Sequence, residues 1–368
     1  MTVPPAPFSS PDHPARAWHV RALHLVLAVA LLLACALAGS GTHAAVATPR
    51  PMAATVTSDD SPLAGPWGRY LVKTDEPYNA WLRATGANKT ALAKIALRAR
   101  VRWFGTWLPT ADVAPRIANY VKVSQAGDRN KLVQLAVFRL WPNGGEPARS
   151  KPLSAADQDA YRAWIRAAAK GIGSSRVAVV LEPDLPVALK GWRPEVRMAL
   201  TRYAAQVLSA LPRTTVYIDA GDADWLTADA AVSMLRSSGV AYARGFSLGA
   251  THYWSIASQV AYGRQLIDKL AAAGVRDKHM VIDTADNAKP FTWLQYYDLH
   301  PRGDFDNAET CAARTSYRCV SLGHPPTFRT GDPAHVDAYL WFGRPWLTRQ
   351  ASPFDLRRAL AVTRTTPY

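Results

Sequence analysis

Carboxylates directly follow three strand-like apolar runs of this sequence. The run 177–181 leads into Glu182-Pro183-Asp184, the run 216–218 into Asp219, and the run 280–282 into Asp283. A single aspartate in such a position usually caps the next helix or makes a turn. The carboxyl ends of parallel strands share one face of a barrel, so three such aspartates would converge on one cleft.

Clustered carboxylates without metal-ligating histidines favour hydrolysis of glycosidic bonds. One carboxyl must keep its proton near neutral pH to protonate the leaving oxygen, and burial or a neighbouring carboxylate raises its pKa enough to allow this. Sugar rings also pack on flat apolar side chains, and for any single tryptophan core packing is the commoner role. The tryptophans nearest the acidic segments are Trp67, Trp103, Trp107, Trp225, Trp254 and Trp341.

The apolar pattern predicts that strands and helices alternate. Strands are expected at residues 132–138, 177–181, 216–218, 280–282 and 338–341. Helices are expected at 154–170, 191–211, 227–238 and 255–274. In the first helix, Ser154 and Asp157 resemble a capping box, and Gly171 suits the C-terminal stop. This alternation over about 300 residues favours an α/β fold, a single parallel β/α barrel.

Six blocks, in order along residues 63–368, resemble glycoside hydrolase family 6, the cellobiohydrolases and endo-β-1,4-glucanases. The blocks are Leu63-Ala64-Gly65 with Tyr70-Leu71-Val72, Trp103-Phe104-Gly105-Thr106-Trp107, Leu181-Glu182-Pro183-Asp184, Tyr217-Ile218-Asp219-Ala220-Gly221, Val281-Ile282-Asp283-Thr284 with Asn287, and Asp337-Ala338-Tyr339-Leu340-Trp341. The resemblance implies a distorted β/α barrel that cleaves cellulose or a related β-glucan. It also implies inversion, with Asp184 as the general acid.

The same resemblance gives roles to further residues. Asp219, one strand along, would raise the pKa of Asp184 and stabilise the positive charge of the transition state. No metal or cofactor is expected, and the expected partner of a monomeric protein is a β-glucan chain. Substrate contacts are expected from Trp103, Trp107, Phe138, Trp225, Asp283, Asn287, Trp341 and Arg344.

The sequence departs from the family pattern where the attacking water would be activated. The family's YDxPxRDC-like segment here reads Phe138-Arg139-Leu140-Trp141-Pro142-Asn143-Gly144-Gly145-Glu146, and the loop 343–349, where the family has its proposed base, contains no carboxylate. The family's histidine after Asp-Ala-Gly is Asp222, and its GFAxN asparagine is Gly249. Glu146 is therefore our candidate base. If Arg139 and Arg344 instead hold a sugar hydroxyl or neutralise a carboxylate, the protein would act on a different glucan or be inactive. An inactive family member that binds cell-wall glycans is one alternative.

A serine esterase is a second and weaker alternative. Gly245-Phe246-Ser247-Leu248-Gly249 fits the G-x-S-x-G pattern, and Asp283 with His300, His324 and His335 follows in the order that an α/β-hydrolase requires. However, no His-Gly oxyanion segment precedes Ser247, and the same residues fall where family 6 has GFAxN.

Composition excludes a disordered chain and does not favour nucleic-acid binding. The 368 residues are 49% hydrophobic and 19% charged, which suffices for a sizeable core. The net charge of +15 comes from scattered basic residues without a run of five or a recognition motif.

The first residues are typical of a secretory signal peptide. Basic residues precede an apolar run at 25–38, and Ala45-Val46-Ala47 offers a cleavage site. That run is too short to span a bilayer. We expect a signal peptide at 1–47, a linker at 48–62 and a catalytic domain at 63–368, with secretion or a lipid anchor at Cys35. Cys311 and Cys319 predict one disulfide and do not fit a zinc site.

Overall fold

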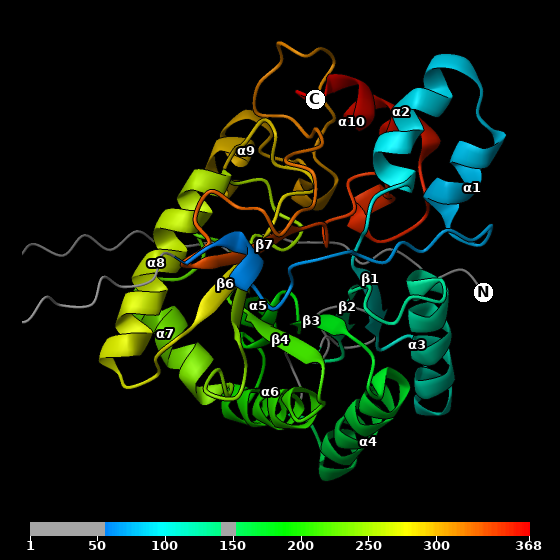
Figure 1. Cartoon of the computed structure of the whole chain (residues 1–368). Helices are drawn as coiled ribbons and strands as arrows, with labels where there is room; N and C mark the ends of the chain where they lie inside the picture. The colour runs from blue at the N-terminus through cyan, green and yellow to red at the C-terminus, as the bar shows by residue number, and fades with distance from the viewer. Residues whose placement is uncertain (1–55, 141–151) are drawn as a thin grey trace, which may run out of the picture. The chain divides into compact units, whose positions relative to one another are not determined.

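Seven parallel strands form one sheet in the computed structural model, which describes residues 56–140 and 152–368 (Figure 1). Each strand pairs with the next one along the chain, and the compact unit spans Val56–Tyr368. The strands are β1 (Arg102–Gly105), β2 (Val133–Phe138), β3 (Val177–Leu181), β4 (Thr214–Asp219), β5 (Gly245–Leu248), β6 (His279–Asp283) and β7 (Val336–Leu340).

The sheet curls until its first and last strands approach each other. The Val101 N–H donates to the Trp341 carbonyl at 2.9 Å, and Nε1 of Trp103 donates to the Phe342 carbonyl at 2.8 Å. Alternate strand residues point inward and fill the interior, among them Ala136, Val180, Tyr217, Val281 and Leu340. The predicted distorted parallel β/α barrel is therefore confirmed.

Helices cover the outer face of the sheet. Their apolar sides pack on the outward strand residues in a single large core that includes Trp164, Phe246 and Leu266. These helices are α3 (Thr110–Gln125), α4 (Ala155–Ile172), α6 (Pro194–Ser209), α7 (Ala228–Ser237) and α8 (Ile256–Ala272).

Shorter elements follow the carboxyl ends of the strands or pack beside them. A second core joins α1 (Glu76–Arg83), α2 (Gly86–Ala96) and α10 (Leu356–Thr365) to the segment around α9 (Trp293–Leu299). The remaining pieces are α5 (Leu185–Ala188) and the 3-10 helices η3 (Phe305–Asn307) and η4 (Thr348–Gln350). The predicted disulfide joins Cys311 to Cys319 after η3.

The pattern predicts α4, α6, α7 and α8 closely, but it misses several helices, among them the 16-residue α3, and the short strands β1 and β5. The Ser154–Asp157 capping box begins α4 as predicted. The helix ends at Gly173, where φ is +57°, rather than at Gly171. Gly171 instead allows α3 to approach, because a Cβ there would lie 2.7 Å from the Ala114 carbonyl oxygen. Strands β1 and β5 have four residues each, too few for a clear alternation.

The predicted signal peptide, Cys35 and most of the predicted linker lie outside the described residues. The end of that linker contains the 3-10 helix η1 (Ser58–Asp60), and Ser61 Oγ donates to the Asp337 carbonyl at 3.0 Å. Leu63 follows and is buried inside the barrel. Within 56–140 and 152–368, no helix has the length and apolarity to cross a bilayer.

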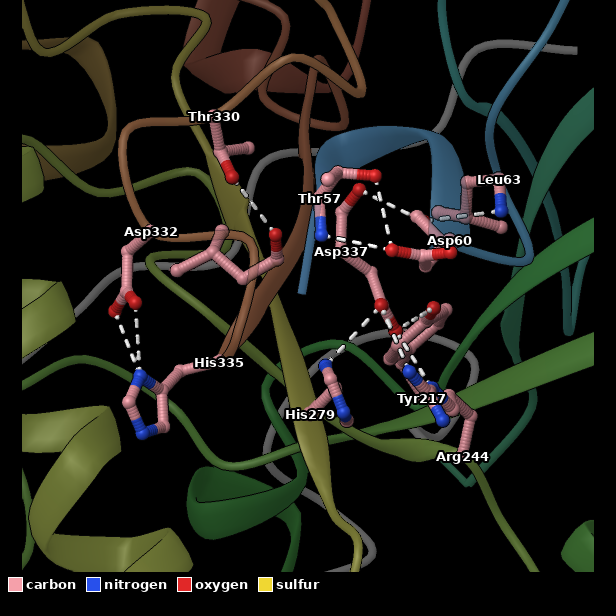
Figure 2. A network of polar contacts seen from close by, with 12 residues as sticks. Thr57, Asp60, Leu63, Tyr217, Arg244, His279, Thr330, Asp332, His335 and Asp337 are labelled. Atoms are coloured by element: carbon pink, nitrogen blue, oxygen red, sulfur yellow. Dashed lines mark hydrogen bonds and ion pairs between the residues drawn. The ribbon is translucent and has the colours of Figure 1, made fainter. Parts of the chain in front are cut away.

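A polar network closes the amino-terminal end of the barrel (Figure 2). Buried Asp337 accepts hydrogen bonds from Tyr217 Oη at 2.7 Å and from Arg244 Nε at 2.9 Å, and His279 Nδ1 lies 3.2 Å from Asp337 Oδ1. Burial alone would raise the pKa of Asp337, but His279 and Arg244 together outweigh it and hold the pKa below its usual value. We assign this end of the barrel to stability, since active sites lie at the other end.

Candidate active site

The three predicted aspartates lie at the carboxyl ends of their strands. Asp219 and Asp283 are the last residues of β4 and β6, and Asp184 precedes α5 three residues after β3. Because all seven strands are parallel, these residues share the end of the barrel opposite the Asp337 network.

Asp184 has the properties of a general acid. Its Oδ1 is buried without a hydrogen-bond partner among the described residues. Burial raises its pKa well above the usual value, the charges of Asp219 and Asp306 raise it further, and Arg344 opposes them. Such a carboxyl holds its proton near neutral pH and can donate it to a leaving oxygen.

Asp219 positions Asp184 from the neighbouring strand. Its Oδ2 accepts the backbone N–H groups of Asp184 at 3.1 Å and Gly221 at 3.0 Å, while Oδ1 accepts Ser247 Oγ at 3.0 Å. Burial raises its pKa to about 7 although these bonds favour the charged form. Since its oxygens are all engaged and buried, Asp219 acts on the site through Asp184.

Asp283 holds the loops of the site together instead of facing a ligand. Its two oxygens accept backbone N–H groups from Thr251 at 3.1 Å, Ala285 at 3.0 Å and Phe342 at 3.3 Å, and also from Gly343. The carboxyl is fully buried, and burial raises its pKa. The loops after β5, β6 and β7 therefore meet on this one side chain.

Asn287 is likewise engaged with the protein. Its Nδ2 donates to the carbonyls of Trp254 at 3.1 Å and Asp283 at 3.3 Å. We expected Asp283 and Asn287 to contact substrate, but the Asp283 carboxyl and Asn287 Nδ2 instead hydrogen-bond to the protein, and Asn287 Oδ1 is buried without a partner among the described residues.

Two further buried carboxylates stand beside the predicted ones, and each is held by a glutamine. Asp222 Oδ1 accepts Gln259 Nε2 at 2.5 Å, and Asp286 Oδ2 accepts Gln350 Nε2 at 2.7 Å. Burial, then the charge of Asp224, raises the pKa of Asp222 to about 8. Burial and Asp283 raise the pKa of Asp286. The motifs identified Asp222 only as a departure from the family and did not identify Asp286 at all.

The tryptophans of the site differ in how much ring surface they expose. Trp107, after β1, is 57% exposed, and Gly105 leaves room for its ring because a Cβ there would overlap it. Trp225 is half-buried, with its ring centroid 4.4 Å from that of His252. Trp103 is nearly buried and packs edge-on against Phe138 at 5.1 Å.

Trp341 is a core residue, which differs from the expected role. Its side chain is fully buried, and its Nε1 donates to the His324 carbonyl at 2.8 Å. No part of its ring is open to a sugar, because the loops after β6 and β7 cover it.

Arg344 places a cation within electrostatic reach of Asp184. Its guanidinium lies 4.3 Å from the centroid of the Trp103 ring, and its backbone N–H donates to Gln350 Oε1 at 2.6 Å. Burial lowers its pKa to about 10, whereas Asp184 and Asp283 favour its charged form. It therefore opposes Asp219 in setting the pKa of Asp184.

Glu146, the candidate base, lies outside the described residues.

Ser247 is the candidate nucleophile of the esterase alternative. Ser247 lies within β5 and is fully buried, and its Oγ donates to Asp219. A serine nucleophile needs an exposed hydroxyl beside an imidazole. The geometry therefore does not support the esterase alternative.

The three histidines of the esterase alternative make contacts elsewhere. His335 Nδ1 lies 2.8 Å from Asp332 at the opposite end of the barrel, and His324 Nδ1 lies 2.7 Å from the Pro325 carbonyl. His300 packs against the Tyr296 ring.

Comparison with known sequences identifies similar proteins. The model of glycosyl hydrolases family 6 matches residues 69–346. Endoglucanase A of Cellulomonas fimi is 31% identical over 279 residues, which are 76% of this chain and 55% of that protein. Endoglucanase 1 of Streptomyces halstedii is 30% identical over 228 residues, 59% of this chain and 68% of that protein. The match to endoglucanase A of Thermobispora bispora covers 49% of that protein, so this chain spans about half the length of two of these relatives.

Comparison with solved structures gives the same fold. The endoglucanase Cel6 of Mycobacterium tuberculosis, solved in complex with a thio-linked cellobioside, superposes with a TM-score of 0.65 at 28% identity, over 82% of this chain and 98% of that one. The catalytic core of the cellobiohydrolase Cel6A of Chaetomium thermophilum gives a TM-score of 0.63 at 20% identity, over 83% and 98% of the two chains. The second likeness concerns the fold alone.

Proposed function

The chain belongs to family 6 of the glycosyl hydrolases, and on this premise we propose that it is a β-1,4-glucanase that cleaves cellulose or a related β-glucan with inversion. The observation that carries the proposal is Asp184, whose Oδ1 is buried without a hydrogen-bond partner among the described residues and whose pKa is strongly raised, at the carboxyl end of a parallel barrel. Neighbouring relatives named endoglucanase support the substrate class.

In the proposed reaction, Asp184 protonates the glycosidic oxygen as the bond from that oxygen to the anomeric carbon breaks. A water attacks the same carbon from the opposite face and loses a proton to a base, so a β-linkage gives an α-anomer. Asp219 acts by holding the Asp184 backbone and by keeping the Asp184 pKa high. Trp107 and Trp225 offer the exposed ring surface on which sugars pack.

The residues that the family pattern assigns to water activation are missing from this sequence. The loop 343–349 has no carboxylate, and Glu146 remains the candidate from sequence.

We also propose that the protein is exported, with residues 1–47 as the signal and Cys35 as an alternative lipid site. A polymeric glucan must be met outside the cell, and the Cys311–Cys319 disulfide suits an oxidising compartment. Mass spectrometry of the protein recovered from culture medium and from membranes tests this: a first residue after position 47 supports a cleaved signal, whereas an acylated Cys35 supports the anchor.

The function is tested by following anomeric protons by NMR while the protein acts on cello-oligosaccharides. We expect α-anomers to appear first and Asp184→Ala to be silent. Asp268→Ala, which changes an exposed carboxylate on α8, should match the wild type. Initial β-anomers would overturn inversion. Binding of cello-oligosaccharides without cleavage by the wild type would replace the proposal with that of a glycan-binding family member.

A further inference from the structure

An inverting glycosidase needs a second carboxylate that takes a proton from water, and one described residue fits this need. We propose that Asp306, in η3, is the general base that works with Asp184. This inference rests on the proposed function, because it presupposes that Asp184 is the acid of an inverting reaction.

Elimination among the carboxylates near Asp184 leads to Asp306. Asp219 and Asp283 are buried, and protein groups engage both oxygens of each. Asp222 and Asp286 are almost completely buried: Asp222 accepts Gln259 Nε2 and the Ala223 N–H, and Asp286 accepts Gln350 Nε2 while its Oδ1 is enclosed without a partner among the described residues. A base must present an oxygen that solvent water can reach, so these four carboxylates do not qualify.

Asp304 and Asp224 do not qualify either. Asp304 pairs with Arg349 at 3.0 Å. Asp224 is exposed and accepts the Trp293 N–H at 3.4 Å, and its charge is not among those that act on Asp184.

Asp306 combines access to solvent with nearness to the acid. Its side chain is partly exposed, and none of the hydrogen bonds within 56–140 and 152–368 involves its carboxylate. Its charge acts directly on Asp184, although no hydrogen bond joins the two residues. Acid and base of an inverting pair do not bond to each other directly, because a water must fit between the base and the sugar.

Aromatic packing fixes the position of η3. Phe305 is buried, with its ring 5.3 Å from His252, and His252 in turn packs edge-on against Trp225. Asp306 therefore follows a residue that is linked to Trp225 through the His252 ring.

The loop 343–349 after β7 has no carboxylate, and the contacts of Arg349 give it another part in the site. Arg349 Nε pairs with Asp304, and the Arg349 N–H donates to Asn307 Oδ1 at 3.2 Å. These contacts hold η3 on both sides of Asp306. In the family, the loop at this position supplies the proposed base. In this chain, the same loop positions η3, which carries the Asp306 carboxylate.

The proton states suit the two roles. Desolvation and the charge of Asp304 raise the pKa of Asp306 to about 6, and Arg349 opposes them. Above about pH 6 Asp306 is therefore ionised while Asp184 still holds its proton. In the reaction, a water oxygen bonds to the anomeric carbon and its proton passes to Asp306. The glycosidic bond breaks, and the Asp184 proton passes to the leaving oxygen, so the charge balances.

The test compares leaving groups and an external nucleophile in the full-length protein. Asp306→Ala and Asp184→Ala are assayed on cellopentaose and on β-cellobiosyl fluoride, with and without azide. Fluoride leaves without protonation, so Asp184→Ala should retain fluoride hydrolysis within about tenfold, whereas Asp306→Ala should lose about 10²- to 10⁴-fold on both substrates. Azide needs no deprotonation and should restore Asp306→Ala at least tenfold on the fluoride. Because the configuration inverts, the product should be the α-glycosyl azide.

One further variant serves as the control: Asp298→Ala removes an exposed carboxylate on α9 and should stay within threefold of the wild type. Glu146→Ala tests the competing base assignment, and azide should not rescue it.

The outcomes separate the two proposals. Near-normal activity of Asp306→Ala, loss without azide rescue, or the rescue pattern in Glu146→Ala instead would overturn the assignment of Asp306 while leaving the glucanase proposal standing. A wild-type protein that cleaves neither substrate would overturn the proposed function, and the base assignment with it.

Discussion

Asp219 Oδ2 accepts the backbone N–H of Asp184 at 3.1 Å, so the second aspartate fixes the main chain of the first and leaves its carboxyl unbonded. Asp184 has a φ of +64°, a left-handed conformation that is unfavourable for a residue with a Cβ. The hydrogen bond from its N–H helps to hold that conformation. The same Asp219 side chain also raises the pKa of Asp184, so geometry and proton affinity depend on one neighbour.

Asp219→Asn separates charge from shape, because the amide occupies the same space as the carboxylate and can keep part of its hydrogen bonding. The Asp184 pKa should fall when the neighbouring negative charge is lost, so the alkaline limb of kcat/KM should move to lower pH. We expect a loss of roughly 10- to 100-fold in kcat, smaller than for removal of the acid itself. Ser247→Ala is the control and should cost less than about tenfold. An unmoved alkaline limb in Asp219→Asn would contradict this role.

Arg344→Gln should shift the same limb in the opposite direction. The guanidinium lowers the Asp184 pKa, so its removal should raise that pKa and extend activity toward higher pH. The substitution retains the backbone N–H that donates to Gln350, and the loop after β7 should therefore keep its position. Full pH profiles of both single variants and of the double variant with Asp219→Asn check the opposite signs. A shift to lower pH in Arg344→Gln would refute the electrostatic account.

Trp107→Ala tests whether exposed ring surface binds sugar. The ring is 57% exposed, so its removal should barely affect stability. Loss of one sugar-packing surface should raise KM by roughly 5- to 30-fold, as expected for a loss of about 1 to 2 kcal/mol. Kinetics on cello-oligosaccharides of increasing length measure the effect. Tyr317→Ala, an exposed aromatic in the disulfide loop, is the matched control and should leave KM unchanged.

Local pattern was enough to predict where the aspartates lie, because strand and acid are adjacent in sequence. Asp184, Asp219 and Asp283 were all predicted to lie at one end of the barrel, as they do. What each does there depends on distant partners. Asp283 is enclosed by backbone amides from the loops after β5 and β7, and no pattern around residue 283 contains that information.

Residues whose burial depends on tertiary packing were predicted less well. Trp107 and Trp341 have the same side chain and both follow a strand, yet one is exposed and the other fully buried. The glutamine that holds Asp286 is 64 residues further along the chain, and the one that holds Asp222 is 37 residues away. Asp306 lies in a 3-10 turn that has no periodic signal.

Asp337→Asn should destabilise the protein without changing the chemistry of the site. The folded-state pKa of Asp337 is depressed, so its ion pairs stabilise the fold above the unfolded-state pKa near 4, and this stability is lost as pH falls through the folded value. We expect a loss of about 2 to 4 kcal/mol at pH 7 that shrinks toward pH 3. Urea unfolding at several pH values measures it. A changed kcat at 25 °C in the folded variant would contradict the assignment of this end to stability.

Glu182→Gln should flatten the dependence of stability on pH. Glu182 is buried after β3, where it accepts the Arg139 and Leu140 N–H groups at 2.9 Å and Tyr161 Oη at 2.8 Å. Burial raises its pKa to about 7 even though these bonds favour the charged form. A folded pKa above the unfolded value near 4.3 means that its stabilisation is complete below pH 4.3 and is lost as pH rises to 7.

Asp219 and Asp222 have raised pKa values and act in the same direction, so the wild-type protein should unfold more easily at pH 8 than at pH 5. The amide introduced by Glu182→Gln cannot titrate, but it can still hydrogen-bond to the Arg139, Leu140 and Tyr161 donors. Between pH 5 and pH 8 the free energy of unfolding should therefore fall by roughly 3 kcal/mol less in the variant than in the wild type. Urea unfolding at pH 5 and pH 8 gives the difference directly. Glu195→Gln changes an exposed residue on α6 and should retain the wild-type dependence. Equal pH dependence in Glu182→Gln and the wild type would show that Glu182 is already ionised in the folded protein at pH 5, because its three hydrogen-bond donors then outweigh its burial.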